Sequence, residues 1–123
     1  MILNAAVTLP QARQTASGQD EMFLVNYLAN VILSNLLIAK DRLSRQRGEP
    51  RLLFISSDSH RGASAVDFEE FGCYFDYGVS KAIANYSYFK LLLNTYATEL
   101  DRRINVSAHS SAVSGRQEIY KGT

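Results

Sequence analysis

Three short apolar runs, separated by two long segments with a helical pattern, limit what this 123-residue chain can fold into. The runs cover residues 1–7, 52–55 and 104–108, and apolar runs of this length are typical of buried strands. Helical patterns fill residues 21–45 and 77–103 between them. Apolar strands that alternate with helices belong to parallel sheets that are covered on both faces. The sequence therefore predicts an α/β fold with the element order β-α-β-α-β and two long helices.

The two helices differ in their apolar patterns. Asp20 is a suitable cap for the first helix, whose apolar residues nearly encircle it, so we expect this helix to be covered on most sides. The second helix carries one clean apolar stripe, formed by Ala82, Tyr86, Phe89, Leu93, Tyr96 and Leu100. Residues 10–19, 45–50 and 56–76 are expected to be loops. Residues 1–109 then form one domain, and residues 110–123 a polar tail that we expect to be mobile.

Composition excludes several classes of function. Thirteen basic and twelve acidic residues give a net charge of +1, which predicts no binding to nucleic acid. Cys73 is the only cysteine, so a disulfide framework is excluded and we expect a reducing, cytoplasmic location. His60 and His109 are the only histidines, too few for a structural zinc site, and we expect no metal. The first residues lack the basic region of a signal peptide.

Residues 22–39 are apolar enough to require a comparison with a membrane span. The segment has 18 residues, whereas a transmembrane helix needs about 20 that are predominantly apolar. It also contains Asn26, Asn30 and Asn35, and amide side chains are costly in lipid. We therefore expect a helix buried inside a protein and no membrane span.

Tyr77 and Lys81 form the strongest local signal for chemistry. Residues four apart share a face of a helix, and an ammonium near a phenol favours the phenolate and lowers its pKa. A tyrosine with a lowered pKa can give or take a proton near neutral pH. Most Tyr-x-x-x-Lys pairs are surface neighbours without a function, so the pair has to be weighed together with other motifs.

Two further segments could contribute polar groups. Ser56 and Ser57 follow the second apolar run, and ligands of parallel sheets bind beyond the carboxyl ends of the strands. The alternative is that they simply begin a loop. Asn26 lies in an apolar helix pattern and must find a hydrogen-bonding partner. That partner can be a backbone group, or a water molecule near a site.

Together these segments resemble the short-chain dehydrogenase/reductase family over about residues 1–108. Residues 4–6 resemble its Asn-Asn-Ala-Gly motif, residues 25–29 its Val-Asn-x-x-Gly segment, and residues 51–57 its strand that ends in the catalytic serine. Residues 77–81, Tyr-Gly-Val-Ser-Lys, resemble its Tyr-x-x-Ser-Lys motif. Within the family, residues 4–7 and 57–61 look most like the retinol dehydrogenase and WW-domain oxidoreductase branch.

The resemblance implies a partial Rossmann-like sheet and a catalytic tetrad of Asn26, Ser57, Tyr77 and Lys81. Tyr77 would transfer the proton, Ser57 would hold the substrate oxygen, and Asn26 would anchor a water linked to Lys81. Lys81 would lower the pKa of Tyr77 and, with Tyr77 and residues Asn4, Ala5 and Ala6, would contact NAD or NADP. The implied activity is an NAD(P)-dependent oxidoreductase that reduces a carbonyl or oxidises an alcohol of a small molecule.

The sequence departs from the family where the cofactor binds. A dinucleotide site needs a glycine-rich turn at a helix N-terminus, and no two of the seven glycines are close enough to form one. After the third apolar run the family has Pro-Gly, whereas this chain has Ala108-His109-Ser110. Ala6 and Ala29 stand where the family has glycines. We therefore expect a truncated relative that retains the catalytic half.

Other functions remain open from the sequence. In the family, helices that match residues 21–45 and 77–103 build a dimer interface. A catalytically inactive interaction protein, a homodimer or a heterodimer with a full-length relative, is therefore the alternative. A serine hydrolase using Ser57 and His60 is disfavoured because no Gly-x-Ser-x-Gly elbow is present. The sequons at Asn85 and Asn105 fall in expected regular structure, and we interpret them as coincidental.

Overall fold

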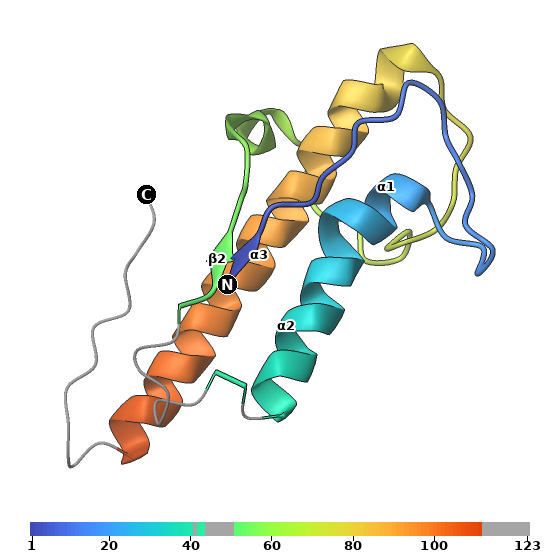
Figure 1. The fold of residues 1–123 in the computed structure, drawn as a ribbon. Coiled ribbons are helices and arrows are strands. Elements are labelled where there is room, and N and C mark those ends of the chain that lie inside the picture. The colour runs from blue at the N-terminus through green and yellow to red at the C-terminus, as the bar shows by residue number, and fades with distance from the viewer. Residues whose placement is uncertain (41, 44–50, 112–123) are drawn as a thin grey trace.

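The computed structural model describes residues 1–40, 42, 43 and 51–111, and the side chains within residues 1–104. Two strands and two long helical segments dominate the fold (Figure 1). In chain order the elements are β1 (Ile2–Leu3), α1 (Glu21–Phe23), the π-helical η1 (Leu24–Leu28), α2 (Ala29–Ala39), β2 (Leu53–Phe54), the 3-10 helix η3 (Asp58–Gly62) and α3 (Val79–Ser111).

The strands form a two-stranded parallel sheet. Ile2 lies opposite Leu53 and Leu3 opposite Phe54. The amides of Leu53 and Ile55 donate to the carbonyls of Met1 and Leu3 at 3.0 Å. A helix connects the two parallel strands, as the sequence predicts, and the fold is mixed α/β.

The first long helix begins where the sequence predicts and ends earlier. The Asp20 carboxylate accepts a hydrogen bond of 2.9 Å from the amide of Phe23, which satisfies a donor that the helix itself leaves free. The elements α1, η1 and α2 then run on without a break to Ala39. The expected extension to residue 45 is wrong where the structure describes it, because residues 42 and 43 form a turn. The charged residues that follow Ala39 have no apolar stripe to bury, and residues 44 and 45 lie outside the described residues.

The expected third strand is wrong, because residues 104–108 are part of α3. No glycine or proline lies between residues 79 and 111 to interrupt the helix. Continuing the helix pairs each backbone amide within the segment, whereas a strand without a neighbour would leave these groups unpaired. The helix also begins at Val79 instead of Tyr77. A complete β-α-β-α-β sheet is therefore not formed by the described residues.

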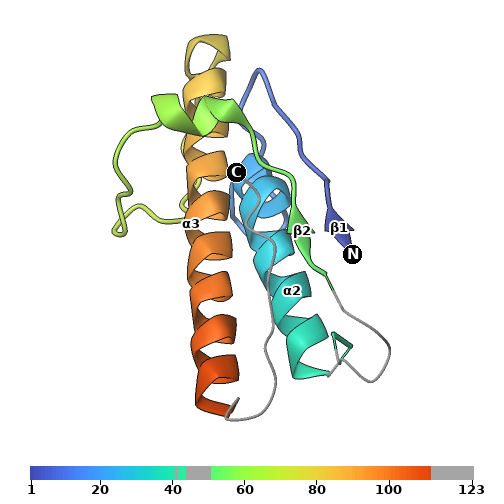
Figure 2. The same ribbon diagram turned by 90° about the vertical axis from the view of Figure 1, so that its left-hand side faces the viewer.

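The two long helices lie side by side and run in the same direction, opposite to the strands (Figures 1 and 2). The Ser34 and Tyr96 hydroxyls form a hydrogen bond of 2.7 Å between α2 and α3. Phe54 of β2 contacts the ring of Tyr96 with centroids 6.0 Å apart. The sheet therefore packs one face against the helices, and Ile2, Leu53 and Ile55 are exposed on the other.

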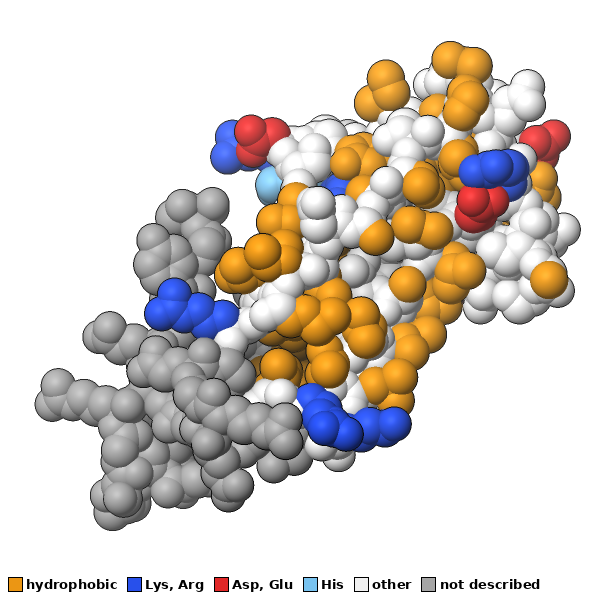
Figure 3. Space-filling view, in the orientation of Figure 1, with side chains coloured by type: hydrophobic (Ala, Val, Ile, Leu, Met, Phe, Trp, Pro, Cys, Tyr) orange, Lys and Arg blue, Asp and Glu red, His pale blue; other side chains and the backbone are white. Residues whose placement is uncertain are grey.

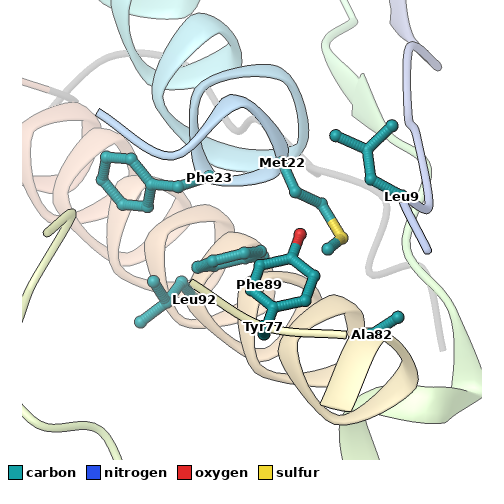
Figure 4. Close-up of a cluster of buried hydrophobic side chains, with 7 residues drawn as sticks. All are labelled: Leu9, Met22, Phe23, Tyr77, Ala82, Phe89 and Leu92. Carbon is teal, nitrogen blue, oxygen red and sulfur yellow. The ribbon is translucent and has the colours of Figure 1, made fainter. Parts of the chain in front are cut away.

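The main hydrophobic core lies between α1, the first half of α3 and the segment that follows β1 (Figure 4). Phe23 links this core to neighbouring aromatic residues, with its ring 5.8 Å from that of Phe89 and 5.5 Å from that of Tyr27. Two residues of the predicted α3 stripe, Ala82 and Phe89, belong to this core, and Tyr86 packs against it. The buried members of the cluster are Leu9, Met22, Phe23, Tyr77, Ala82, Phe89 and Leu92.

The expectation that the first helix is covered on most sides is wrong. Ile32, Leu33 and Leu36 keep 48%, 38% and 50% of their surface exposed. By length and composition the helix over Glu21–Ala39 could cross a membrane, because its most apolar 18-residue stretch has a mean hydropathy of 1.8, and 28% of that stretch is buried. Core helices of soluble proteins and signal sequences share these properties, so they do not establish a span.

Candidate functional site

Asn26 is fully buried and ties the first helix to the segment after β1. Its Oδ1 accepts a hydrogen bond of 2.8 Å from the amide of Val7, and its Nδ2 donates one of 2.7 Å to the carbonyl of the same residue. It lies in η1, where the amide of Ala29 bonds to the carbonyl of Leu24, five residues back. Of the two roles expected for Asn26, the structure thus shows the one in which the amide satisfies backbone groups.

Residues Asn4, Ala5 and Ala6 lie in the extended segment between β1 and Val7, and all three are exposed. They are therefore accessible to a ligand at the carboxyl end of β1. Their backbone position is fixed by Leu3 on one side, which is buried under the helices, and by the Asn26–Val7 pair on the other.

Ser57 lies just beyond β2 and caps η3. Its hydroxyl accepts hydrogen bonds from the Ser59 amide at 3.3 Å and from the Ser59 hydroxyl at 2.9 Å. The His60 ring contacts the carbonyl of Ser57 through Nδ1, so that nitrogen is bound to the backbone and not to the Ser57 hydroxyl. Ser57 and His60 are thus not arranged as a nucleophile and its base.

Tyr77 is a core residue and lies two positions before α3. Its ring packs near Met22 and Leu9, and its hydroxyl points toward the start of the first helix (Figure 4). No described residue makes a hydrogen bond to this buried hydroxyl. Burial, followed by the nearby negative charges of Asp20 and Glu21, raises the pKa of Tyr77 to about 12. The expected lowering of this pKa by Lys81 is therefore wrong.

The separation of Tyr77 from Lys81 has a local cause. Gly78 lies outside the helix, and the amide of Lys81 bonds to the Gly78 carbonyl at 3.1 Å in the first turn of α3. Tyr77 therefore does not share a helical face with Lys81, and the Lys81 side chain is exposed while Tyr77 is buried. Among the described residues no hydrogen bond joins any two members of the predicted tetrad, Asn26, Ser57, Tyr77 and Lys81.

Lys90 is a buried cation that the sequence interpretation missed. It is 2% exposed, and its Nζ donates a hydrogen bond of 3.0 Å to the carbonyl of Ile55. The Nζ also lies 5.6 Å from the centroid of the Tyr86 ring. Burial lowers the pKa of Lys90. The signal that could have found it is its spacing, because Lys90 is four residues after Tyr86 and three before Leu93 on the apolar stripe.

Other candidate groups remain apart. In the part of the chain that the structure describes, no three His, Cys, Asp or Glu side chains are close enough to hold a metal ion. Cys73 is exposed and unbonded to another cysteine. The first sequon residue, Asn85, lies within α3, and the side chain of Asn105 lies outside the described side chains.

Comparisons with protein-family models, curated proteins and solved structures give no match to this chain. The similarity to short-chain dehydrogenases therefore stays a prediction that depends on the four sequence motifs. What the structure confirms is the coarser fold class, a mixed α/β fold with one parallel strand pair and a helical crossover.

Proposed function

We propose that this chain is an interaction protein that pairs through the outward face of α2, either with a second copy of itself or with a full-length relative. The observation that carries the proposal is the inverted polarity of the first helix. Asn26, Asn30 and Ser34, spaced four apart on one face, are buried. The opposite face carries exposed Ile32, Leu33 and Leu36.

The buried polar face makes its hydrogen bonds within the chain. Asn30 donates to the carbonyls of Val25 and Asn26 at 3.3 and 3.2 Å. Ser34 donates to the Asn30 carbonyl at 2.7 Å and bonds to the Tyr96 hydroxyl of α3. The polar side chains therefore hold the helix in this rotation, which leaves the leucine and isoleucine side chains outside.

An apolar face of this kind favours association. Figure 3 shows hydrophobic side chains gathered along the course of α2, with a group of basic side chains at its lower end. Removing apolar surface from water contributes about 25 cal/mol per Å², and contiguous exposed patches commonly mark interaction sites. A dimer related by a two-fold axis would bury the apolar side chains of this face on both copies.

Sedimentation velocity over a range of protein concentrations tests the proposal. We expect the sedimentation coefficient to rise with concentration for the natural chain and to stay at the monomer value for a Leu33→Glu/Leu36→Glu variant. Val79→Glu is the matched control, because Val79 is 70% exposed at the start of α3 and glutamate suits the first turn of a helix. A natural chain that remains monomeric alone and with a full-length relative would contradict the proposal.

An NAD(P)-dependent oxidoreductase is the second candidate. The order of the four motifs supports it, as does the position of Ser57 beyond the carboxyl end of a parallel strand, where ligands of such sheets bind. The described residues do not fit a dinucleotide, however. The first helix is capped by Asp20 and begins with Glu21, and these negative charges oppose a pyrophosphate. Tyr77 precedes α3 and does not share a helical face with Lys81. We therefore derive no catalytic step through the cofactor.

A titration of NADH and NADPH, followed by nicotinamide fluorescence, tests the second candidate. The chain has no tryptophan, so its own background is low. If the oxidoreductase assignment is right, binding saturates, and Tyr77→Phe abolishes turnover of alcohols and carbonyls because it removes the transferable proton. A folded chain that binds neither nucleotide contradicts this candidate and leaves the interaction proposal intact.

A further inference from the structure

An exposed aromatic ring stands at the tip of the connection between η3 and α3, in a turn formed by residues 67–72. Phe68 is 80% exposed, although it is a large apolar side chain. Figure 2 shows the chain between η3 and α3 looping out beside α3. The ring of Phe68 stacks on that of Phe71, with centroids 6.4 Å apart and planes inclined by 24°.

Contacts with aromatic residues of the first helix hold the turn in place. Phe71 makes edge contacts with Phe23 and Tyr27 at 5.4 and 5.6 Å between centroids. Gly72 has a φ of +75°, and a Cβ at this position would lie 2.9 Å from the Phe23 ring. The turn is therefore seated against the core with a backbone conformation that favours glycine.

Hydrogen bonds fix the other end of the turn. The amide of Asp67 donates to the Tyr88 hydroxyl at 3.2 Å, and the same hydroxyl lies 3.3 Å from the Asp67 carbonyl, to which it donates. The amide of Glu69 donates to the Asp67 carboxylate at 2.9 Å. Phe68 thus points outward between Asp67 and Phe71, which are both held to the rest of the fold. Less conformational entropy is then lost when a ligand binds.

The surroundings of Phe68 are acidic. Asp67, Glu69 and Glu70 are all exposed, and residues 63–80 contain four acidic residues and no lysine or arginine. Among the described residues, none of these three carboxylates makes an ion pair. An aromatic face surrounded by unpaired carboxylates attracts a cation both through the ring and through the charges.

We propose that this turn, with Phe68 over Phe71 and the carboxylates of Asp67, Glu69 and Glu70, is a docking site for a basic peptide segment rich in arginine. The guanidinium group is planar and weakly hydrated, so it stacks on an aromatic face better than an ammonium does. Its charge is complementary to the three carboxylates. The site is separate from the outward face of α2 and does not depend on the pairing proposed above.

The test is fluorescence anisotropy of labelled octa-arginine, titrated with the full chain at low salt. Saturable binding is expected, weakening as salt rises because exposed charges are screened. Phe68→Ala is expected to lower the affinity about two- to fivefold, in line with an exposed cation–π contact. Glu69→Gln/Glu70→Gln is expected to lower it and to flatten the salt dependence. Ile83→Ala is the matched control and keeps the affinity, because Ile83 is 71% exposed on α3 outside the turn.

Several results would overturn the docking site. They are the absence of saturable binding, equal binding of labelled octa-glutamate, and unchanged affinity in the Phe68→Ala variant. Sedimentation of the Phe68→Ala and Leu33→Glu/Leu36→Glu variants separates the two proposals. If Phe68→Ala abolishes self-association and octa-arginine does not bind, the turn contacts a second copy, and the basic peptide is excluded.

Discussion

Replacing Asn26 by leucine is expected to destabilise the fold by about 2–4 kcal/mol. The substitution keeps the number of side-chain heavy atoms and the branching at Cγ, and it removes both hydrogen bonds to Val7, which are 2.8 and 2.7 Å long. Leaving a buried donor or acceptor unsatisfied costs about 1–3 kcal/mol each. The Val7 groups are partly buried, so water recovers part of that cost and places the sum below the maximum.

Urea unfolding followed by far-UV circular dichroism measures this effect. With a denaturant slope of about 2 kcal/mol/M, the middle of the range for small proteins, the transition midpoint is expected to fall by about 1–2 M. Asn35→Leu is the matched control, because Asn35 is exposed on the same helix, and its midpoint is expected to stay within a few tenths of a molar of the natural value. Equal midpoints for the two variants would refute the argument that Asn26 holds the segment after β1.

Three further predictions concern single residues elsewhere in the fold. Gly72→Ala is expected to lower the free energy of unfolding by about 1–3 kcal/mol, because alanine is strained at positive φ and its Cβ would meet the Phe23 ring. Gly62→Ala is the control, because there is open space around Gly62, and its melting temperature should be unchanged or higher. A lower melting temperature for Gly62→Ala than for Gly72→Ala would refute the prediction. For Lys90, burial lowers the folded-state pKa below the ordinary value of 10.5, so the folded state binds fewer protons than the unfolded state and the free energy of unfolding should rise as the pH rises toward 10.5. In urea unfolding at several pH values, Lys90→Met should show a smaller rise of the midpoint with pH than the natural chain. An equal rise in both would count against a buried amine at residue 90. For Tyr77, whose pKa is raised to about 12, stability should be complete below pH 10 and fall between pH 10 and 12, and a fall of the same size in Tyr77→Phe would show that other groups cause it.

The polar face of the first helix illustrates the difference between what residue spacing predicts and what contacts with distant segments decide. The asparagines and the serine at residues 26, 30 and 34 are spaced four apart, so the sequence shows that they share a face. It does not show whether that face points inward, because a helix that is apolar nearly all round can be rotated either way. The partners that decide the rotation are Val7, 19 residues away, and Tyr96, 62 residues away.

The arrangement of the predicted site residues also depends on contacts with distant segments, which the sequence does not show. Tyr77 and Lys81 have the spacing of a helical pair, and the pattern would place them on one face if the helix began at residue 77. The helix begins at Val79, and the carbonyl of Tyr77 instead accepts a hydrogen bond of 3.1 Å from the amide of Ala12. The phenol is thereby held in the core, a position that depends on a segment 65 residues earlier in the chain.

By itself, the sequence determined the features whose causes lie within a few residues. The Asp20 cap fixed the start of the first helix, the apolar runs marked both strands, and the stripe of α3 marked its buried face. Only the tertiary structure decided the features that depend on contacts across the chain. These are the outward rotation of the leucines of α2, the burial of Lys90 against the carbonyl of Ile55, and the helical state of residues 104–108. The physical reason is that capping and periodicity act between neighbours, whereas burial and the pairing of backbone groups depend on which distant segments meet.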